Sequence, residues 1–573
     1  MKKITSIGIC LVLCVSILAA AFPGPMGQQS SQTAAITDTS RALETTLAVD
    51  ELISARDSRS SYDPSLCTQV DLDSLDGCKI TEEGSYILSG TLNGQIIIDA
   101  GDQAKVQLIL QDATIKNSGD AALYIKSADK VFLTLVGASS IESSGFESAD
   151  DKVDGAIFSK SDLSINGTGS LKISSADNGI VVKDSLVIVQ ASLNITSTGH
   201  GLDVNDSIAI KDAELTINAQ KDGMHCESDT EGFIYISQAS LSITSAQDGI
   251  DSSSEILISG GSYEIVSGGS SSKATKKANE MDYRGWTSAA VTEEEDISTK
   301  AIKAYGLLVI EDGSFVLDSC DDAIHSNTDI LISGGLFSIK SGDDGMHADG
   351  QLEIDAGLVK VLQSYEGLEA TVIVIRGSEL QITASDDGFN ASDGTQTQVT
   401  APGAWGMGAF DQSSGCLLLI SGGNITASAS GDGLDSNGSL LISGGTTIVY
   451  GPTNDGNGAL DYGISGQITG GTLIAFGSSG MAQGVSSTVQ PTMLISTSSQ
   501  AAGTKMSLKQ SSSTILEATS LKAFSSVVIS SPLLEASGSY TLNLGSSSQS
   551  ITLSGLSYSS QSNSRMKQPG RFF

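Results

Sequence analysis

The sequence is poor in basic residues, aromatic residues and proline. Its 573 residues contain 31 Lys and Arg against 66 Asp and Glu, so the formal net charge is -35 at pH 7. A chain this acidic repels phosphate groups, which argues against a nucleic-acid partner. Only 8 residues are Pro whereas 63 are Gly, so we expect turns built from Gly, Asn, Asp and Ser. Aromatic residues make up 5% of the chain, which leaves few side chains to stack on a sugar ring.

Long hydrophobic runs are absent after the N-terminus. Met1, Lys2 and Lys3 precede an apolar stretch that ends in small residues, Ala19 to Ala21. This order is typical of a secretory signal peptide, so we predict a signal over residues 1–21 and an extracellular protein. The alternative is an uncleaved anchor that keeps the chain at the cell surface. Residues 22–61 are rich in Ser, Thr, Ala and Gln and are predicted to be a linker.

The seven cysteines lack the paired spacing of a zinc site. Two of them lie in the predicted signal. Cys67 and Cys78 bracket a polar turn and are candidates for a disulfide in an oxidising compartment. Cys226, Cys320 and Cys416 are isolated, and we expect them to pack as small apolar side chains.

A short phrase recurs along the chain with small changes. It starts at Asp222 (DGMHCES), Asp248, Asp322 (DAIHSN), Asp344 (DGMHAD), Glu366 (EGLEAT), Asp387 (DGFNAS) and Asp432 (DGLDSN). From Asp322 the phrase returns after 22, 22 and 21 residues. Between the phrases lie strand-like runs such as DILISGGLFSIKSG. A fixed period of this length predicts the stacked coils of a solenoid.

The repeats predict an all-β fold, a right-handed parallel β-helix. Strands without an intervening helix pair with the same strand one coil later, and parallel crossovers are almost always right-handed. We place the β-helix at residues 62–484, with loop insertions at 268–300 and 393–415. Residues 485–573 lose the phrase but remain strand-like, so we predict a C-terminal β cap and tail there. We expect the protein to be a monomer.

Alignment of the phrases produces columns of polar residues. The first column contains Asp222, Asp248, Asp322, Asp344, Glu366, Asp387 and Asp432. The second column, three residues later, contains His225, Asp251, His325, His347, Glu369, Asn390 and Asp435. A partial third column before the first contains Asp321, Asp343 and Asp386.

Stacked carboxylates about 5 Å apart repel one another, which raises their pKa values or disrupts the turn. A divalent cation held by oxygens of adjacent coils removes this repulsion, and calcium accepts about 6–8 oxygen ligands in irregular geometry. We therefore predict calcium as the cofactor, held mainly at Asp343, Asp344, Glu366, Glu369, Asp386 and Asp387. The alternative is that the Asp-Gly pairs are ordinary turns whose side chains cap nearby backbone.

Four basic or titratable side chains interrupt the acidic columns. His325 and His347 are expected to hydrogen-bond carboxylates or to face a ligand, with ligation of a transition metal as the alternative. The segment STKAIKAYG places Lys300 in the Asp322 column and Lys303 in the His325 column. These lysines would neutralise the stack by salt bridges, grip a sugar carboxylate, or act as a base of lowered pKa on C5 of a uronate.

Several long phrases resemble, in order, bacterial carbohydrate-binding domain-containing proteins related to a clostridial protein that binds cellulose and acid sugars. The segments are KAIKA, DSCDDAIHSN, SGDDGMHADG, YEGLEA, DDGFNAS, GDGLDSNGSLLISGG and GALDYGISGQITGGTLIAFGSSGMAQ. The resemblance covers about residues 70–560 and implies a secreted parallel β-helix shaped like pectate lyases, with bound calcium. It implies calcium ligands at Asp321, Asp322, Asp343, Asp344, Glu366, Glu369, Asp386, Asp387 and Asn390. Ala301 stands where the family usually has Gly, which puts the direction of the Lys303 side chain in doubt.

From these features we predict a calcium-dependent binder of plant-wall polysaccharides, with cellulose and polygalacturonate-type sugars as ligands. The expected ligand-binding residues are Lys303, His325, His347, Trp286 and Trp405. The two tryptophans and Tyr283 lie in the insertions, where they would rim a groove or simply pack on the coil below. One alternative is a calcium-dependent polysaccharide lyase with Lys300, Lys303 or Arg376 as the base. The other is a structural surface adhesin in which calcium serves stability alone.

Overall fold

The computed structural model describes residues 43, 48–147, 152–228, 232–275, 297–394 and 415–560. All of them belong to the unit Asp38–Phe573. The predicted signal peptide, most of the linker, Tyr283, Trp286 and Trp405 lie outside these residues. Within the described residues, no helix has the length and apolar character needed to cross a membrane.

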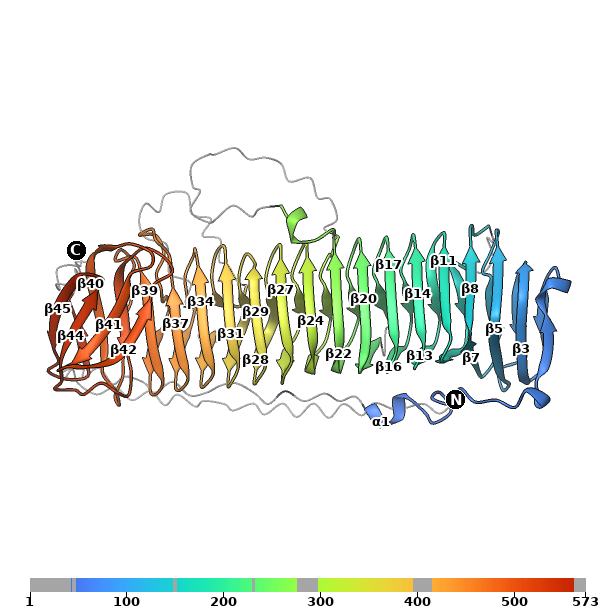
Figure 1. Cartoon of the computed structure of the whole chain (residues 1–573), viewed down its shortest axis with the longest axis horizontal. Coiled ribbons are helices and arrows are strands. Elements are labelled where there is room, and N and C mark those ends of the chain that lie inside the picture. The colour runs from blue at the N-terminus through green and yellow to red at the C-terminus, as the bar shows by residue number, and fades with distance from the viewer. Residues whose placement is uncertain are drawn as a thin grey trace, which may run out of the picture. The chain divides into compact units, whose positions relative to one another are not determined.

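The chain forms a parallel β-solenoid whose coils stack side by side along one axis (Figure 1). Each coil contributes strands to three strand columns, which we call A, B and C. Column A contains β2 (Cys78–Ile80), β4 (Ile96–Asp99), β6 (Leu123–Ser127), β9 (Gly155–Ser159), β12 (Asn178–Val182), β15 (Leu202–Val204), β18 (Met224–Cys226), β21 (Ile250–Ser252), β23 (Ile302–Ala304), β25 (Ile324–Ser326), the first parts of β28 (Met346–Ile354) and β30 (Leu368–Ile375), β32 (Phe389–Ala391) and β35 (Asp435–Ser436).

Columns B and C follow A along each coil. Column B contains β1 (Thr68–Asp71), the first parts of β3 (Gly84–Asn93) and β5 (Lys105–Asn117), β7 (Lys130–Val136), β10 (Asp162–Gly167), β13 (Ser185–Val189), β16 (Ser207–Lys211), β19 (Phe233–Ser237), the first parts of β22 (Ile256–Ser267) and β24 (Leu308–Ser319), β26 (Ile330–Ile332), the second parts of β28 and β30, β33 (Leu417–Ile420), β36 (Ser439–Ile442) and β38 (Ser465–Ile468). Column C contains the second parts of β3, β5, β22 and β24, with β8 (Ala138–Ser143), β11 (Ser170–Ser175), β14 (Ser192–Ser197), β17 (Glu214–Ala219), β20 (Ala239–Ser245), β27 (Leu336–Ser341), β29 (Leu358–Gln363), β31 (Glu379–Ala384), β34 (Asn424–Ala429), β37 (Thr446–Tyr450) and β39 (Thr472–Gly477).

These parallel ladders confirm the β-helix expected from the repeat. The interior is filled by every second side chain of each strand, because successive side chains of a strand point to opposite faces. In column A, Ile180, Leu202 and Met224 are register partners in successive coils and all are fully buried. In column C, the rings of Tyr263 and Phe315 stack with centroids 4.6 Å apart. This spacing follows from the ~4.8 Å distance between neighbouring strands.

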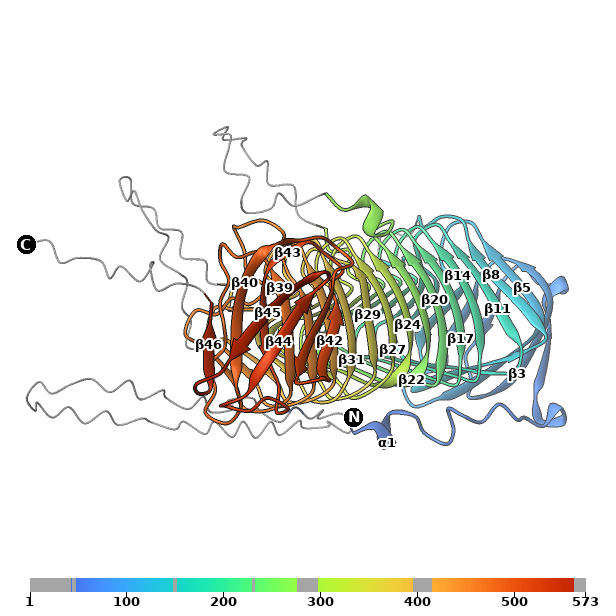
Figure 2. The same cartoon turned by 60° about the vertical axis from the view of Figure 1, so that its left-hand side comes forward.

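The C-terminal strands lie at one end of the stack (Figures 1 and 2). Strand β43 (Phe524–Ser530) pairs antiparallel with β39 and with β40 (Thr492–Gln500), and β40 pairs with β46 (Ser557–Ser559). A separate sheet has the order β42 (Ser513–Thr519), β41 (Lys505–Gln510), β44 (Ser539–Leu544), β45 (Ser547–Thr552). Both groups share an apolar cluster that also includes Tyr450 of β37 and Ile474 and Phe476 of β39. That this region protects the solenoid as a cap stays a prediction.

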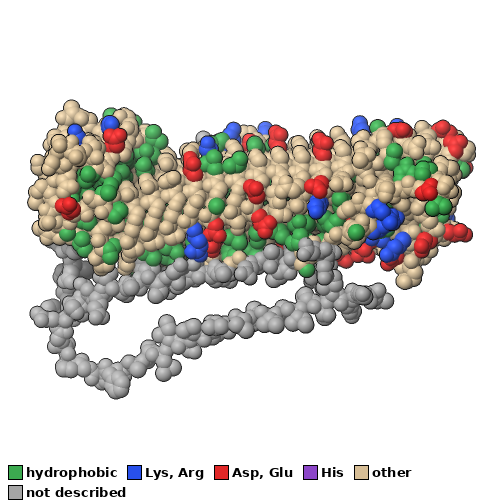
Figure 3. All heavy atoms as spheres, turned by 60° about the horizontal axis from the view of Figure 1, so that its bottom comes forward, with side chains coloured by type: hydrophobic (Ala, Val, Ile, Leu, Met, Phe, Trp, Pro, Cys, Tyr) green, Lys and Arg blue, Asp and Glu red, His purple; other side chains and the backbone are tan. Residues whose placement is uncertain are grey.

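The structure corrects two expectations near the N-terminus. Part of the predicted linker packs on the solenoid, because Val49 and Leu52 of helix α1 (Val49–Leu52), with Ile53, contact an apolar outer patch that includes Tyr235. In Figure 3 the face that carries α1 is turned to the viewer, and hydrophobic side chains gather there between single charged ones. Short 3-10 turns follow at Pro64–Leu66, Leu72–Ser74 and, later, Ser271–Lys273.

The second correction concerns the cysteines. Cys67 and Cys78 are free thiols rather than a disulfide, and Cys67 instead donates a hydrogen bond through its Sγ to the Asp63 carbonyl. Cys226 and Cys416 are buried, as expected for small apolar side chains, whereas Cys320 is only partly buried.

Candidate functional site

The repeated phrase forms a continuous band of polar side chains at the beginning of column A. We call this band the carboxylate ladder; it consists of the first-column and second-column residues from His200 to Asp461. Register pairs place Asp251, Lys303, His325, His347, Glu369, Asn390 and Asp435 in one line across successive coils. The sequence alignment of the columns, including the placement of Lys303, is therefore confirmed.

One oxygen of each first-column aspartate has a structural role. Asp222 Oδ1 accepts the backbone N–H of Asp248 at 2.8 Å, and Asp322 Oδ1 accepts that of Asp344 at 3.0 Å. Asp344 Oδ1 in turn accepts the backbone N–H of Glu366 at 3.1 Å. The phrase therefore caps the backbone of the next coil, whereas the alternative from the sequence was capping within an ordinary turn. The second carboxylate oxygen of each residue stays available for other partners.

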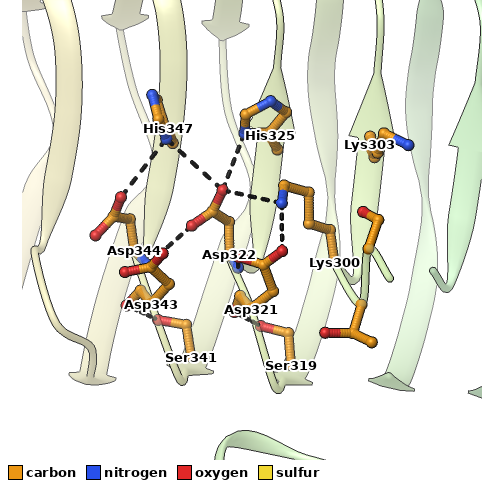
Figure 4. A network of polar contacts seen from close by, with 12 residues as sticks. Lys300, Lys303, Ser319, Asp321, Asp322, His325, Ser341, Asp343, Asp344 and His347 are labelled. Atoms are coloured by element: carbon orange, nitrogen blue, oxygen red, sulfur yellow. Dashed lines mark hydrogen bonds and ion pairs between the residues drawn. The ribbon is translucent and has the colours of Figure 1, made fainter. Parts of the chain in front are cut away.

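The section of the ladder from Asp222 to His347 contains cations that balance its acids; we call it the balanced section. Asp322 Oδ2 lies 2.9 Å from His325 Nδ1, 3.7 Å from His347 Nδ1 and 3.6 Å from Lys300 Nζ (Figure 4). Lys300 also hydrogen-bonds Asp321. One carboxylate of this coil is thus surrounded by three basic side chains drawn from three successive coils.

Lys303 contacts two carboxylates of the preceding coil in the same section. Its Nζ is 3.3 Å from Asp248 Oδ2 and 3.2 Å from Asp251 Oδ1. These three side chains line a cavity of about 290 Å³ together with Asp222, Gln247, Ile297 and Ser298. The cavity gives the balanced section an opening to the surface.

The pKa values follow from these contacts. Burial opposes the charge of Lys300 and Lys303, but the neighbouring carboxylates outweigh it and raise the pKa of both ammonium groups. Burial likewise opposes the charge of His347, yet Asp322 and Glu369 raise its pKa to about 9. For Asp322 burial favours the neutral acid, and the two histidines with Lys300 overcome it and lower the pKa. A base of lowered pKa at either lysine is therefore contradicted, and the salt-bridge interpretation is supported.

Beyond His347 the ladder is acidic; we call the part from Asp344 to Asp461 the acidic section. Among the residues that the structure describes, Glu366, Asp387 and Asp432 form no ion pair with a Lys or Arg side chain. Burial and then the neighbouring Glu369 raise the pKa of Glu366 to about 8. Burial and then the carboxylates of Asp435, Asp432 and Glu366 raise the pKa of Asp387 well above its usual range.

Two further acids extend this pattern to both ends of the section. Burial, followed by Asp322 and Glu366, raises the pKa of Asp344 well above its usual range. Burial and then Asp461 raise the pKa of Asp432 to about 7, against the hydrogen bond from the Gly458 backbone. The rise in pKa that the sequence predicted for stacked acids is thus largest in the acidic section.

Two groups of possible metal ligands lie where the balanced section meets the acidic section. One carboxylate oxygen each from Asp321, Asp322 and Asp343 lie within 4.8 Å of one another, as do ligand atoms of Asp344, His347 and Glu369.

In the next coils, Asn390 Nδ2 donates to Glu366 Oε2 at 2.9 Å, while Asn390 Oδ1 is buried without a hydrogen-bond donor. Carboxylate and amide oxygens are the ligands that calcium prefers. Asp386 and Asp387 lie on the same coil as Asn390, just before it in the chain. The structure therefore brings the nine predicted ligands onto one edge of the solenoid.

Of the predicted residues that the structure describes, Arg376 is not part of this site. Arg376 follows the end of β30, whereas the ladder residues lie at the start of that strand, and its Nε contacts Glu353 at 2.6 Å and Asp355 at 3.3 Å. Trp286 and Trp405 fall outside the described residues, so their roles in sugar binding stay predictions.

A shallow groove of about 820 Å³ lies at the corner between columns B and C, on the turns of seven successive coils. Its floor is formed by small residues of these turns, such as Gly169, Ser192 and Ser240. Gln190, Asp212 and Gln238 line it at equivalent turns, with left-handed φ values of 53°, 52° and 52°. The groove thus offers the same polar side-chain position in three successive coils, at steps of ~4.8 Å.

Part of the sequence is similar to carbohydrate-binding domain-containing proteins. Residues 76–345 match the family model described as "Carbohydrate-binding domain-containing protein". The predicted family resemblance is confirmed. A protein of Acetivibrio thermocellus with the same description is 36% identical over 135 residues, which are 21% of this chain and 47% of that protein. The chain thus spans about half the length of this relative.

A solved structure titled as a polysaccharide lyase-like protein from C. thermocellum, in a gadolinium derivative, is 28% identical. The match covers 35% of this chain and 88% of that chain, with a TM-score of 0.32.

The match to this family model ends at residue 345. It therefore includes the groove and the balanced section of the ladder except His347, and Glu366, Asp387 and Asp432 follow after it. Sequence analysis placed Asp432 and Asp435 in the columns but left them out of the metal set. Asp461 was missed altogether, because LDYG in place of the usual phrase hides its alignment; the bridge between Leu434 and Leu460 reveals it.

Proposed function

We propose that this protein is a secreted, calcium-dependent binder of acidic plant-wall polysaccharide of the polygalacturonate type. The observation that carries the proposal is the acidic section, where the partly buried Glu366, Asp387 and Asp432 lie in successive coils without a Lys or Arg partner among the described residues. Membership of the matched domain in a carbohydrate-binding family supports a polysaccharide as the ligand.

Calcium accounts for an acidic protein that binds an acidic sugar. Calcium would be held by the carboxylates of Asp344, Glu366, Glu369 and Asp387 and by the amide oxygen of Asn390. When bound, calcium supplies positive charge that attracts a uronate carboxylate. The side chains of the ladder themselves fix where that charge lies, because one oxygen of Asp344 is held by the backbone of the next coil.

The decisive measurement is calorimetry with oligogalacturonate in calcium and in chelator. We expect binding in calcium, loss of binding in chelator, and at least a 10-fold weaker affinity in Glu366→Gln, because each lost calcium–carboxylate contact weakens the ion that bridges to the sugar. Glu264→Gln is the matched control, since Glu264 is an exposed carboxylate outside the ladder. Equal binding with and without calcium would overturn the proposal, and stabilisation by calcium without sugar binding would favour the structural adhesin.

For cellulose we propose the groove between columns B and C. A neutral glucan gains nothing from calcium, but an extended chain of pyranose units has a repeat similar to the ~4.8 Å coil spacing. Gln190, Asp212 and Gln238 would then meet successive sugar hydroxyls along the solenoid axis.

Gln190→Ala is expected to weaken cellulose retention by about 2- to 10-fold, the effect of one lost hydrogen bond. Uronate binding should stay unchanged, since Gln190 lies away from the ladder. Gln381→Ala, an exposed glutamine on β31, is the control in pull-down assays. Cellulose retention that follows calcium and ignores Gln190 would place both sugars on the ladder instead.

The lyase alternative receives no support from the lysines. A general base must be neutral at the working pH, and the pKa of Lys303 is raised by its two carboxylate partners. We expect no increase in ultraviolet absorbance from unsaturated product when polygalacturonate and calcium are supplied. Product formed by the wild type and abolished in Lys303→Ala would show that the chain is a lyase.

A further inference from the structure

All four histidines of the chain lie on the ladder, in two pairs. Each pair comes from neighbouring coils and shares one aspartate: His200 and His225 share Asp222, and His325 and His347 share Asp322. In both groups, one ligand atom of each residue lies within 4.8 Å of the others. Two imidazoles and one carboxylate form a ligand set suited to zinc and other transition metals.

The geometry of the first group fits a small tetrahedral ion. Asp222 Oδ2 lies 3.0 Å from His200 Nδ1 and 3.6 Å from His225 Nδ1. Ligand atoms about 2.05 Å from a tetrahedral zinc are about 3.3 Å apart, which lies between these two distances. The imidazole rings stack with centroids 4.8 Å apart, and both Nδ1 atoms lie near Asp222 Oδ2.

His200 Nδ1 has no satisfied hydrogen bond. The atom is buried, and although it is close to Asp222 it makes no hydrogen bond there. A buried nitrogen without a partner is costly in a protein interior, and a metal ion would satisfy it.

The surroundings of His225 resemble the outer shell of a metal site. Its Nε2 lies 3.1 Å from Glu227 Oε2, which is the carboxylate–histidine arrangement that orients metal-binding imidazoles. Asp251 Oδ2, 3.0 Å from His225 Nδ1, offers a further carboxylate ligand. Asp222 and Asp251 also line the cavity of about 290 Å³, which provides an entry path for the ion.

We propose that His200, Asp222 and His225 bind one divalent transition metal, with zinc as the preferred ion. This site is separate from the acidic section and would join two coils of the solenoid. The second group differs: its rings are T-shaped rather than stacked, and Lys300 Nζ lies 3.6 Å from the shared oxygen of Asp322. The ammonium occupies the position of a cation there, so His325 and His347 bind no zinc while Lys300 is present.

The test is the zinc content of full-length protein without a histidine tag, measured by elemental analysis after dialysis against zinc and then against a large excess of calcium. We expect one zinc per chain in the wild type and none in His200→Asn. Asparagine suits this position because Asn178 occupies it in the preceding coil and caps the His200 backbone at 2.7 Å. His325→Asn should retain one zinc, and Lys300→Met should bind two. Glu227→Gln is expected to weaken zinc binding by about 10- to 100-fold.

Two results would overturn the proposal: no zinc retained by the wild type, or the same zinc content in His200→Asn as in the wild type. Circular dichroism of each variant shows whether the β-helix is intact. Because sugar binding is not the readout, failure of this site leaves the calcium proposal unaffected, and loss of uronate binding leaves the zinc measurement unaffected.

Discussion

Neutralising two buried acids is expected to stabilise the calcium-free protein and to abolish its stabilisation by calcium. In Glu366→Gln/Asp387→Asn both amide side chains keep an oxygen where the carboxylate was, so the hydrogen bond from the Asp432 backbone to residue 387 is retained. The repulsion among Glu366, Asp387, Asp432 and Asp435 is reduced. The variant should therefore melt above the wild type in chelator.

When calcium is added, the wild type should melt above the variant. A ligand present at about 100 to 1,000 times its dissociation constant stabilises the native state by about 3–4 kcal/mol. The variant lacks two of the carboxylates that we propose as calcium ligands. Thermal melts of both proteins in chelator and in calcium measure this crossing. Glu264→Gln, which lies outside the ladder, should follow the wild type in both conditions. Parallel curves for variant and wild type, without a crossing, would mean that these carboxylates hold no cation.

Much of the fold was predictable because the repeated phrase marks the register of each coil. The phrase places an apolar residue after each Asp-Gly pair, and those residues, such as Met346 and Leu368, are buried partners in adjacent coils. The parallel β-helix and the alignment of Lys303 with His325 follow directly from this spacing. The packing of α1 was hidden, because three apolar residues in a polar stretch do not reveal a surface that lies 140 residues later.

The chemistry of the ladder was only partly predictable. The sequence shows which residues stack, but not where a side chain finds its partner. Lys300 was aligned with the Asp322 column, yet only the structure shows that it neutralises Asp321 and Asp322. It also shows that, among the described residues, Glu366, Asp387 and Asp432 form no ion pair with a Lys or Arg side chain. The His200 group was missed for a similar reason: its three ligands belong to two different columns, so no single column shows them together.

The calcium-free protein is expected to lose stability as pH rises from about 4.5 to about 8. Burial and neighbouring acids raise the pKa of Glu366 to about 8 and that of Asp432 to about 7 in the folded state. Between the unfolded and the folded pKa the native state binds more protons than the unfolded chain, so the stability falls with rising pH. Each unit of difference corresponds to about 1.4 kcal/mol, and the buried acids together lower the free energy of unfolding by several kcal/mol.

Two histidines add to this loss of stability at the upper end of the pH range. The pKa of His225 and that of His347 are raised to about 9, so their contribution is complete below the unfolded value near 6.5 and is lost as pH rises through 9. Urea unfolding in chelator from pH 4.5 to 9 measures the combined slope.

Calcium should reverse the trend over the same range, because the ion displaces the protons of the acidic section and binds more tightly as they dissociate. A calcium-free stability that rises with pH would show that these carboxylates are already ionised and balanced, and the argument for a cation at the acidic section would fail.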